Sequence, residues 1–122
     1  MPAHKNLVFI FSDQQRYDSM ACYGNDWIKT PNLNALSEES FIFERAYVSQ
    51  PVCTPARATI VTGLYPHNSS PMNVIPLTAE HKSIAEYLPE GYTTAWYGKW
   101  HLGNDQRAQH GFEHWVTYED DY

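Results

Sequence analysis

The stretch PVCTPARATIVTG, residues 51–63, decides the fold because it carries the signals of one helix from its start to its end. Proline is tolerated in the first turn of a helix, so Pro55 places the helix start at Cys53. Gly63 stands where a helix C-terminal cap is expected. The sequence therefore predicts a helix that begins at the cysteine and stops before Gly63.

Three segments around this helix have the patterns of β-strands. The continuous apolar run NLVFIFS, residues 6–12, is typical of a parallel strand buried on both faces. FIFERAYV at 41–48 alternates well enough for a second strand, and TTAWYGK, which ends at Lys99, predicts a third.

Helices are expected between these strands. Thr30 followed by Pro31 has the pattern of a helix N-cap and first turn, and a further helix is expected near 80–88, stopped by Pro89. The Pro-, Asn- and Ser-rich stretch at 65–76 predicts a loop. Strands alternating with helices indicate an α/β fold with a mostly parallel sheet flanked by helices.

Composition limits the class of protein. The chain has 122 residues, of which 43% are hydrophobic, which is enough for one compact core. A net charge of −6 with eight Lys and Arg argues against a nucleic-acid partner. No run approaches the roughly 20 apolar residues that span a bilayer, and no signal-peptide cleavage region follows the first apolar run. We expect a cytoplasmic protein without a membrane partner; a periplasmic or secreted protein is the alternative.

Polar residues with useful chemistry follow the predicted strands, where ligands bind in open α/β sheets. Cys53 opens a helix, whose N-terminus attracts anions, and Arg57 lies four residues on, on the same helix face. We expect Asp13, Cys53, Arg57, Lys99 and His101 to converge on one pocket. A carboxylate for a metal, cations for an anion and a nucleophile position suit the hydrolysis of a charged ester.

These residues resemble the signatures of the type I sulfatase family. Cys53, Pro55 and Arg57 match the CxPxR motif, and the Thr-Gly pair at 62–63 matches its extension. GKWHLG at 98–103 resembles the second signature of the family. The resemblance covers almost the whole chain and implies an alkaline phosphatase-like fold.

The resemblance also implies an activity and a set of roles. The cysteine would be oxidised by a separate formylglycine-generating or sulfatase-maturating enzyme to formylglycine, whose hydrated aldehyde attacks a sulfate ester and then releases sulfate. Asp13, Gln14 and residue 53 would ligate Ca²⁺ or another divalent metal. Arg57 would hold the formylglycine, Lys99 would bridge it to the sulfate, and His101 would act as the base that helps to release sulfate.

One departure from the family pattern bears on substrate. Many sulfatases carry two aspartates after the first strand, whereas here Asp13 is followed by Gln14, which brings no charge to a metal. This form also resembles choline sulfatases and phosphonate monoester hydrolases of the same superfamily. Gln14 could instead hydrogen-bond to a metal ligand, Asp13 could cap a turn, and Cys53 could be a small buried residue. Arg16 and Asp18 are expected to form a local ion pair or to contact substrate.

Calcium binds six to eight oxygens, more than these residues offer. We therefore expect residues 1–122 to be the N-terminal part of a sulfatase catalytic domain. Three functions remain open: a sulfuric ester hydrolase, a phosphate or phosphonate ester hydrolase of the same superfamily, and a non-catalytic fragment. The alcohol portion of the ester and the oligomeric state have no readable signal.

Overall fold

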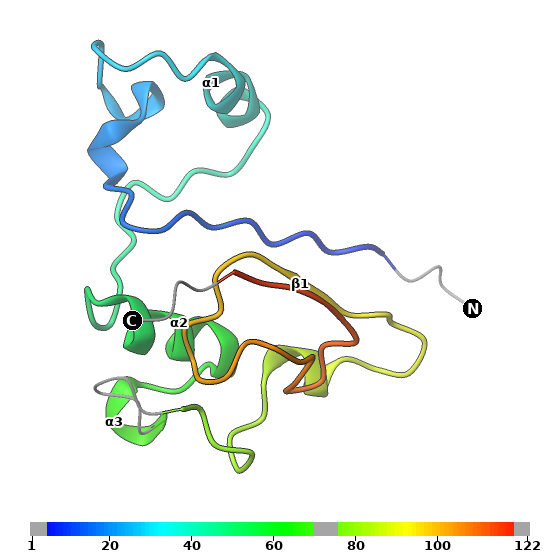
Figure 1. Ribbon diagram of the computed structural model, residues 1–122. Coiled ribbons are helices and arrows are strands. Elements are labelled where there is room, and N and C mark those ends of the chain that lie inside the picture. The colour runs from blue at the N-terminus through cyan, green and yellow to red at the C-terminus, as the bar shows by residue number, and fades with distance from the viewer. Residues whose placement is uncertain (1–4, 70–75, 119–122) are drawn as a thin grey trace. The chain divides into compact units, whose positions relative to one another are not determined.

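The computed structural model describes residues 5–69 and 76–118 and divides into two compact units. One unit is Leu7–Tyr47, and the other combines Met1–Asn6 with Val48–Tyr122. The larger unit contains the helices α2 and α3, the 3-10 helix η3 and both strands; the smaller contains α1, η1 and η2 (Figure 1).

Helix α2, Cys53–Thr62, confirms the predicted helix at both ends. Val52 before it is extended, with φ −135°, and its carbonyl accepts the first helical bond from the N–H of Ala56 at 3.0 Å. Gly63 after it has φ 72°, a left-handed conformation that glycine adopts without a Cβ penalty. Helix α3, Pro66–Ser69, contacts α2 and occupies the start of the predicted loop at 65–76; residues 70–75 of that loop lie outside the described ranges.

Strands β1, Ala95–Tyr97, and β2, His114–Val116, form a parallel pair. Ala95 is opposite His114, Trp96 is opposite Trp115, and Tyr97 is opposite Val116. β1 confirms the third predicted strand, though it is shorter than 93–99. β2 was not predicted, because three residues are too few for an alternation to stand out from the surrounding sequence.

The helix expected near 80–88 is shorter and tighter than predicted. The structure has η3, Ile84–Tyr87, with a complete capping box in which the Ser83 hydroxyl accepts from the N–H of Ala85 at 3.0 Å and the Glu86 carboxylate accepts from the N–H of Ser83 at 2.8 Å. Leu88 is already extended, with ψ 142°, as expected for a residue before proline. Because the capping box starts the helix at Ser83 and Pro89 ends it, one helical turn fits between them.

The larger unit has a small apolar core. Its buried members come from α2 and from the segments before η3 and after β1: Ala58, Val61, Leu77, Trp100 and Leu102. Trp96, Phe112 and Trp115 are half-buried and pack against this core. The core therefore joins α2 to the residues that follow β1.

The unit Leu7–Tyr47 contains the 3-10 helices η1 (Tyr17–Ser19) and η2 (Ala21–Tyr23) and the helix α1 (Pro31–Glu38). α1 confirms the predicted helix, with Pro31 in its first turn and the Thr30 carbonyl accepting from the N–H of Asn34 at 2.9 Å. The Thr30 hydroxyl also accepts from the N–H of Ala21 at 3.1 Å, which ties η2 to the start of α1.

The predictions of strands at 6–12 and 41–48 are wrong for this structure. Both segments are irregular, and β1 and β2 are the strands that pair within the described residues (Figure 1). Val8 is 78% exposed and Ile10 87% exposed. An apolar run indicates that a segment is suited to burial, but a strand forms only as part of a hydrogen-bonded ladder, and neither segment belongs to a strand pair among the described residues.

None of the helices in residues 5–69 and 76–118 combines the length and the apolar character that crossing a membrane requires. The parallel pairing of β1 and β2, with helices in the same unit, agrees with the predicted α/β class.

Candidate active site

The first turn of α2 is the centre of the candidate site. Cys53 is the first helical residue and is a half-buried free thiol, so the prediction that the cysteine sits at a helix N-terminus is confirmed. Thr54 and Pro55 are buried directly behind it. Unsatisfied N–H groups and the helix dipole favour negative charge at this terminus.

Arg57 connects α2 to the second motif. Its side chain is 5% exposed, and its Nη1 donates a 2.6 Å hydrogen bond to the main-chain carbonyl of Lys99, 42 residues away in the sequence. A charged donor makes this bond shorter and stronger than one between neutral groups. The CTPAR helix and the GKWHLG segment are therefore in direct contact.

The segment 98–102, which follows β1, is held by its main chain as well. The N–H of Gly98 donates to the carbonyl of Val116 at 2.7 Å, and the carbonyl of Leu102 accepts from the N–H of Leu77 at 2.8 Å. Between these points His101 has φ 55°, a left-handed conformation that is uncommon for a residue with a side chain. The carbonyl of Lys99, which receives the Arg57 bond, lies within this fixed stretch.

His101 has one polar atom that bears on its predicted role. Its Nδ1 is buried and has no hydrogen-bond partner among the described residues, while the residue as a whole is half-buried. A buried imidazole nitrogen without a partner loses the hydrogen bond it would make in water, which costs stability. Such a cost is tolerated most often where a ligand, a water or a further part of the protein supplies the partner.

Asp13 and Gln14 lie in the other unit, at a bend that follows the extended residues 5–12. Both are exposed, and Gln14 has φ 55°. Their approach to Cys53 stays a prediction.

The donors do not make a calcium site by themselves. Across the described ranges no three His, Cys, Asp or Glu residues gather closely enough to hold a metal ion. Calcium requires six to eight oxygen ligands, of which Asp13, Gln14 and residue 53 would supply a minority. The residues present therefore do not fit a complete metal centre, and any metal bound here needs further ligands.

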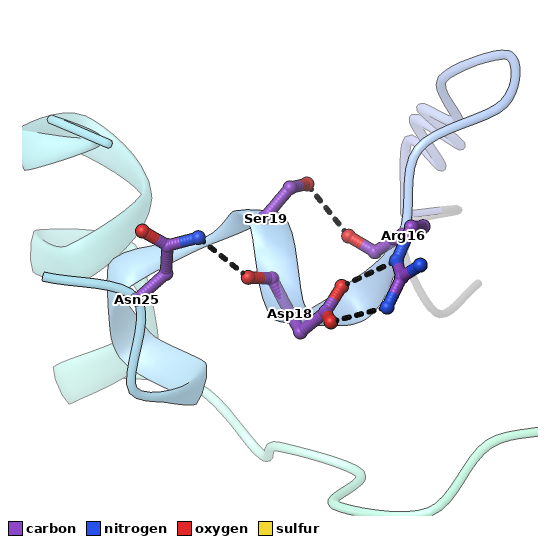
Figure 2. A network of polar contacts seen from close by, with 4 residues as sticks. All are labelled: Arg16, Asp18, Ser19 and Asn25. Carbon is purple, nitrogen blue, oxygen red and sulfur yellow. Dashed lines mark hydrogen bonds and ion pairs between the residues drawn. The ribbon is translucent and has the colours of Figure 1, made fainter. Parts of the chain in front are cut away.

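Arg16 and Asp18 form the local ion pair that the sequence suggested (Figure 2). Nε and Nη2 of Arg16 donate to the two carboxylate oxygens of Asp18 at 2.8 and 2.6 Å. Hydrogen bonding to Arg16 lowers the pKa of Asp18, and hydrogen bonding to Asp18 raises the pKa of Arg16. The Ser19 hydroxyl and the Asn25 amide donate to the main-chain carbonyls of Arg16 and Asp18, and these two bonds hold the turn of η1. Substrate contact by this pair stays a prediction.

Sequence reasoning missed the aromatic side chains that support the second motif. Trp100 is fully buried, and the rings of Trp96, Phe112 and Trp115 surround it. The available signal was the high aromatic content, but these positions have no single helical or strand period that would mark them as one cluster.

Comparison with known proteins identifies the class of protein. The sulfatase family model matches residues 5–122. The chain is 38% identical over 127 residues to an ulvan-active sulfatase of Formosa agariphila and 39% identical over 106 residues to human arylsulfatase A. The alignments cover 97% and 80% of this chain. The chain belongs to the sulfatase family.

A solved structure shows the same relationship. The chain superimposes on a sulfatase, described as putative, from Bacteroides fragilis with a TM-score of 0.83 at 32% identity, over 93% of this chain and 31% of that one. The predicted alkaline phosphatase-like α/β fold is thereby confirmed. The chain spans 25% of the length of the Formosa agariphila relative and 21% of human arylsulfatase A.

Proposed function

We propose that this chain is the nucleophile-bearing, N-terminal part of the catalytic domain of a sulfuric ester hydrolase. The observation that carries the proposal is the 2.6 Å bond from Arg57 to the carbonyl of Lys99, in a chain of the sulfatase family. This bond joins the two sulfatase signatures, CTPAR and GKWHLG, into one arrangement. It brings two cationic residues together in a protein whose net charge is −6.

Residue 53 is the proposed nucleophile, after oxidation of the cysteine to formylglycine. One hydroxyl of the hydrated aldehyde would attack sulfur as the alcohol of the ester leaves. The second hydroxyl would then lose its proton and re-form the aldehyde, which breaks the carbon–oxygen bond to sulfate and releases it; a thiol has no second hydroxyl. Residue 53 lies at the start of α2, where unpaired main-chain N–H groups favour the binding of an anion.

The other predicted residues act on the same anion. The ammonium of Lys99 attracts the sulfate group, and Arg57 holds residue 53 from within α2. His101 moves the proton that accompanies sulfate release. Asp13 and Gln14 are proposed to contribute oxygens to a divalent metal, which would supply Lewis-acid activation once ligands from outside residues 1–122 completed its coordination.

A formylglycine-generating or sulfatase-maturating enzyme is the implied partner. Thr54, Pro55 and Arg57 are buried in the folded chain, so the motif that such an enzyme would bind is not accessible there. We therefore propose that Cys53 is modified before the chain folds. An unfolded peptide covering 49–65 should be modified by such an enzyme, while the folded protein with an unmodified Cys53 should not.

Activity is tested on the full-length protein, expressed together with a maturating enzyme and assayed with an aryl sulfate. We expect turnover that depends on the maturating enzyme and is absent in Cys53→Ala. The relatives include proteins named for ulvan and for N-acetylglucosamine-6-O-sulfate. The alcohol portion is therefore screened with sulfated sugars as well as aryl sulfates. Turnover that persists in Cys53→Ala would contradict the assignment of the nucleophile.

A second candidate is a phosphate or phosphonate ester hydrolase using the same site. The observation behind it is Gln14 after Asp13, a form with one carboxylate fewer that resembles both choline sulfatases and phosphonate monoester hydrolases. A matched pair of aryl sulfate and aryl phosphonate esters distinguishes the two functions. A larger kcat/KM for the phosphonate would replace the sulfatase proposal.

The third possibility, a chain without a working site, is tested on residues 1–122 themselves. We expect neither turnover nor tight calcium binding, even with residue 53 modified, because the available oxygens leave the cation mostly hydrated. Calorimetric titration with calcium and the same ester assay check this expectation. Turnover equal to that of the full-length protein would show that these residues complete the site.

A further inference from the structure

Trp100 separates the two residues of the second motif that the proposed function assigns to catalysis. It lies between Lys99 and His101 in sequence and is 0% exposed, the largest of the fully buried side chains among the described residues. Lys99 and His101 are each half-buried. The centre of the motif is thus anchored in the protein while its two functional neighbours reach partly into solvent.

Aromatic rings contact Trp100 from both strands and from the turn before β2. The ring of Trp96 in β1 lies 4.9 Å away at 86°, and that of Trp115 in β2 lies 5.0 Å away at 68°. Phe112 and His110 contribute rings at 6.2 and 5.8 Å. The edge-to-face contacts with Trp96, Trp115 and Phe112 add to the stabilisation from burial and restrict the orientation of the ring.

The same side chain joins the motif to α2. Trp100 shares one buried cluster with Ala58 and Val61 of α2, the helix that begins at Cys53. Interiors are close-packed, so a buried ring of this size cannot shift without moving its neighbours. Trp100 therefore links the position of the motif to the strand pair and to the nucleophile helix at once.

The backbone around Trp100 needs such an anchor. His101 is held at φ 55°, a conformation that a residue with a side chain adopts at an energetic cost and keeps only where its surroundings enforce it. Hydrogen bonds to main-chain atoms hold the segment at Gly98, Lys99 and Leu102. Between Lys99 and Leu102, the buried indole of Trp100, adjacent to His101 in sequence, anchors the chain to the core.

We propose that Trp100 is a positioning residue: its buried indole fixes the backbone of residues 98–102 and so places Lys99 and His101 relative to Cys53. The consequence for catalysis rests on the proposed sulfatase function. Trp100 itself does not touch the ester, since its side chain is fully buried. Loosening this anchor misplaces two groups that must meet the same sulfate, and misplacement of about 1 Å lowers a rate by about a hundredfold.

The test compares two variants of the full-length, matured protein, Trp100→Phe and Trp115→Phe. Both keep an aromatic ring in the same cluster, which limits the loss of folding. Trp115 is half-buried in β2 and lies outside the second motif in sequence, while its ring contacts that of Trp100, so Trp115→Phe controls for a general weakening of the cluster. Three quantities are measured: the melting temperature, amide hydrogen exchange of residues 98–103 without substrate, and kcat and KM for an aryl sulfate.

We expect a lower melting temperature in both variants. In Trp100→Phe alone we also expect faster amide exchange in residues 98–103 and a kcat about tenfold or more below that of the wild type. Equal exchange at 98–103 in Trp100→Phe and the wild type would overturn the positioning role. Equal losses of kcat in the two variants would do so as well, because the effect would then be one of general stability. If the matured wild type turned over no ester, the proposed function would fail, and hydrogen exchange would still decide whether Trp100 fixes the segment.

Discussion

Replacing Arg57 by methionine tests the contact that joins the two sulfatase signatures. Methionine keeps an unbranched apolar stem and removes the guanidinium, so Arg57→Met deletes the 2.6 Å bond to the carbonyl of Lys99 while filling most of the same space. Arg57 is 5% exposed, which means that solvent screens the bond little. A hydrogen bond from a charged donor contributes about 1.5–3 kcal/mol to stability, and we expect a loss in that range.

The loss is measured as a shift in the midpoint of urea unfolding of the full-length protein, with the slope of the transition unchanged. Arg107→Met is the matched control, because Arg107 is exposed in the same unit and a surface substitution of this kind changes stability by no more than about 0.5 kcal/mol. Arg57→Lys retains the charge but loses the planar, many-donor guanidinium, so its midpoint should fall between those of Arg57→Met and the wild type.

An Arg57→Met protein that unfolds at the same midpoint as Arg107→Met would refute this reasoning, since the contact between the two signatures would then contribute nothing. Catalytic activity cannot make this distinction by itself. Under the proposed function Arg57 belongs to the motif that a maturating enzyme would bind, so an Arg57 variant would also lose activity if Cys53 stayed unmodified. The state of residue 53 is therefore determined by mass spectrometry in every Arg57 variant.

Three further predictions follow from single contacts. Gly111→Ala should lower the melting temperature more than Gly91→Ala. Both glycines have positive φ, 78° and 96°, so alanine at either position costs about 1–2 kcal/mol in backbone strain. A Cβ at Gly111 would also lie 3.0 Å from the main-chain nitrogen of Glu86, whereas the space at Gly91 is open. Equal losses would show that the chain relaxes around the added methyl. Tryptic mass spectrometry of the active protein should find formylglycine at Cys53, and finding cysteine alone there would defeat the proposed mechanism. Asp18 should titrate below its ordinary pKa in an NMR experiment and return toward it in Arg16→Gln, so the pair's contribution to stability is present above the ordinary carboxyl pKa and is lost as the pH falls through the lowered one.

The sequence alone determined those elements whose signals are local. Helix α2 was predicted from Cys53 to the cap at Gly63 because proline in a first turn and glycine in a left-handed cap are properties of single residues. Helix α1 was predicted from Thr30 and Pro31 for the same reason. The motifs likewise indicated the sulfatase family, because each lies within a few residues of sequence.

Strand formation depended on the tertiary structure. Residues 6–12 and 41–48 have the composition of strands but remain irregular and largely exposed, while β2 formed in a three-residue stretch that no pattern marked. A helix satisfies its own backbone hydrogen bonds, whereas a strand depends on partners that its sequence does not specify.

The candidate site shows the same division. Its residue types and motif spacing could be predicted, but the hydrogen bond from Arg57 to Lys99, the left-handed conformation of His101 and the burial of Trp100 could not. Each of these features depends on atoms that are far apart in the chain and are brought together by one small apolar core. Local chemistry therefore indicated which residues to propose for the site, and tertiary packing decided how two of its segments are held together, because packing acts on distances in space that sequence spacing does not contain.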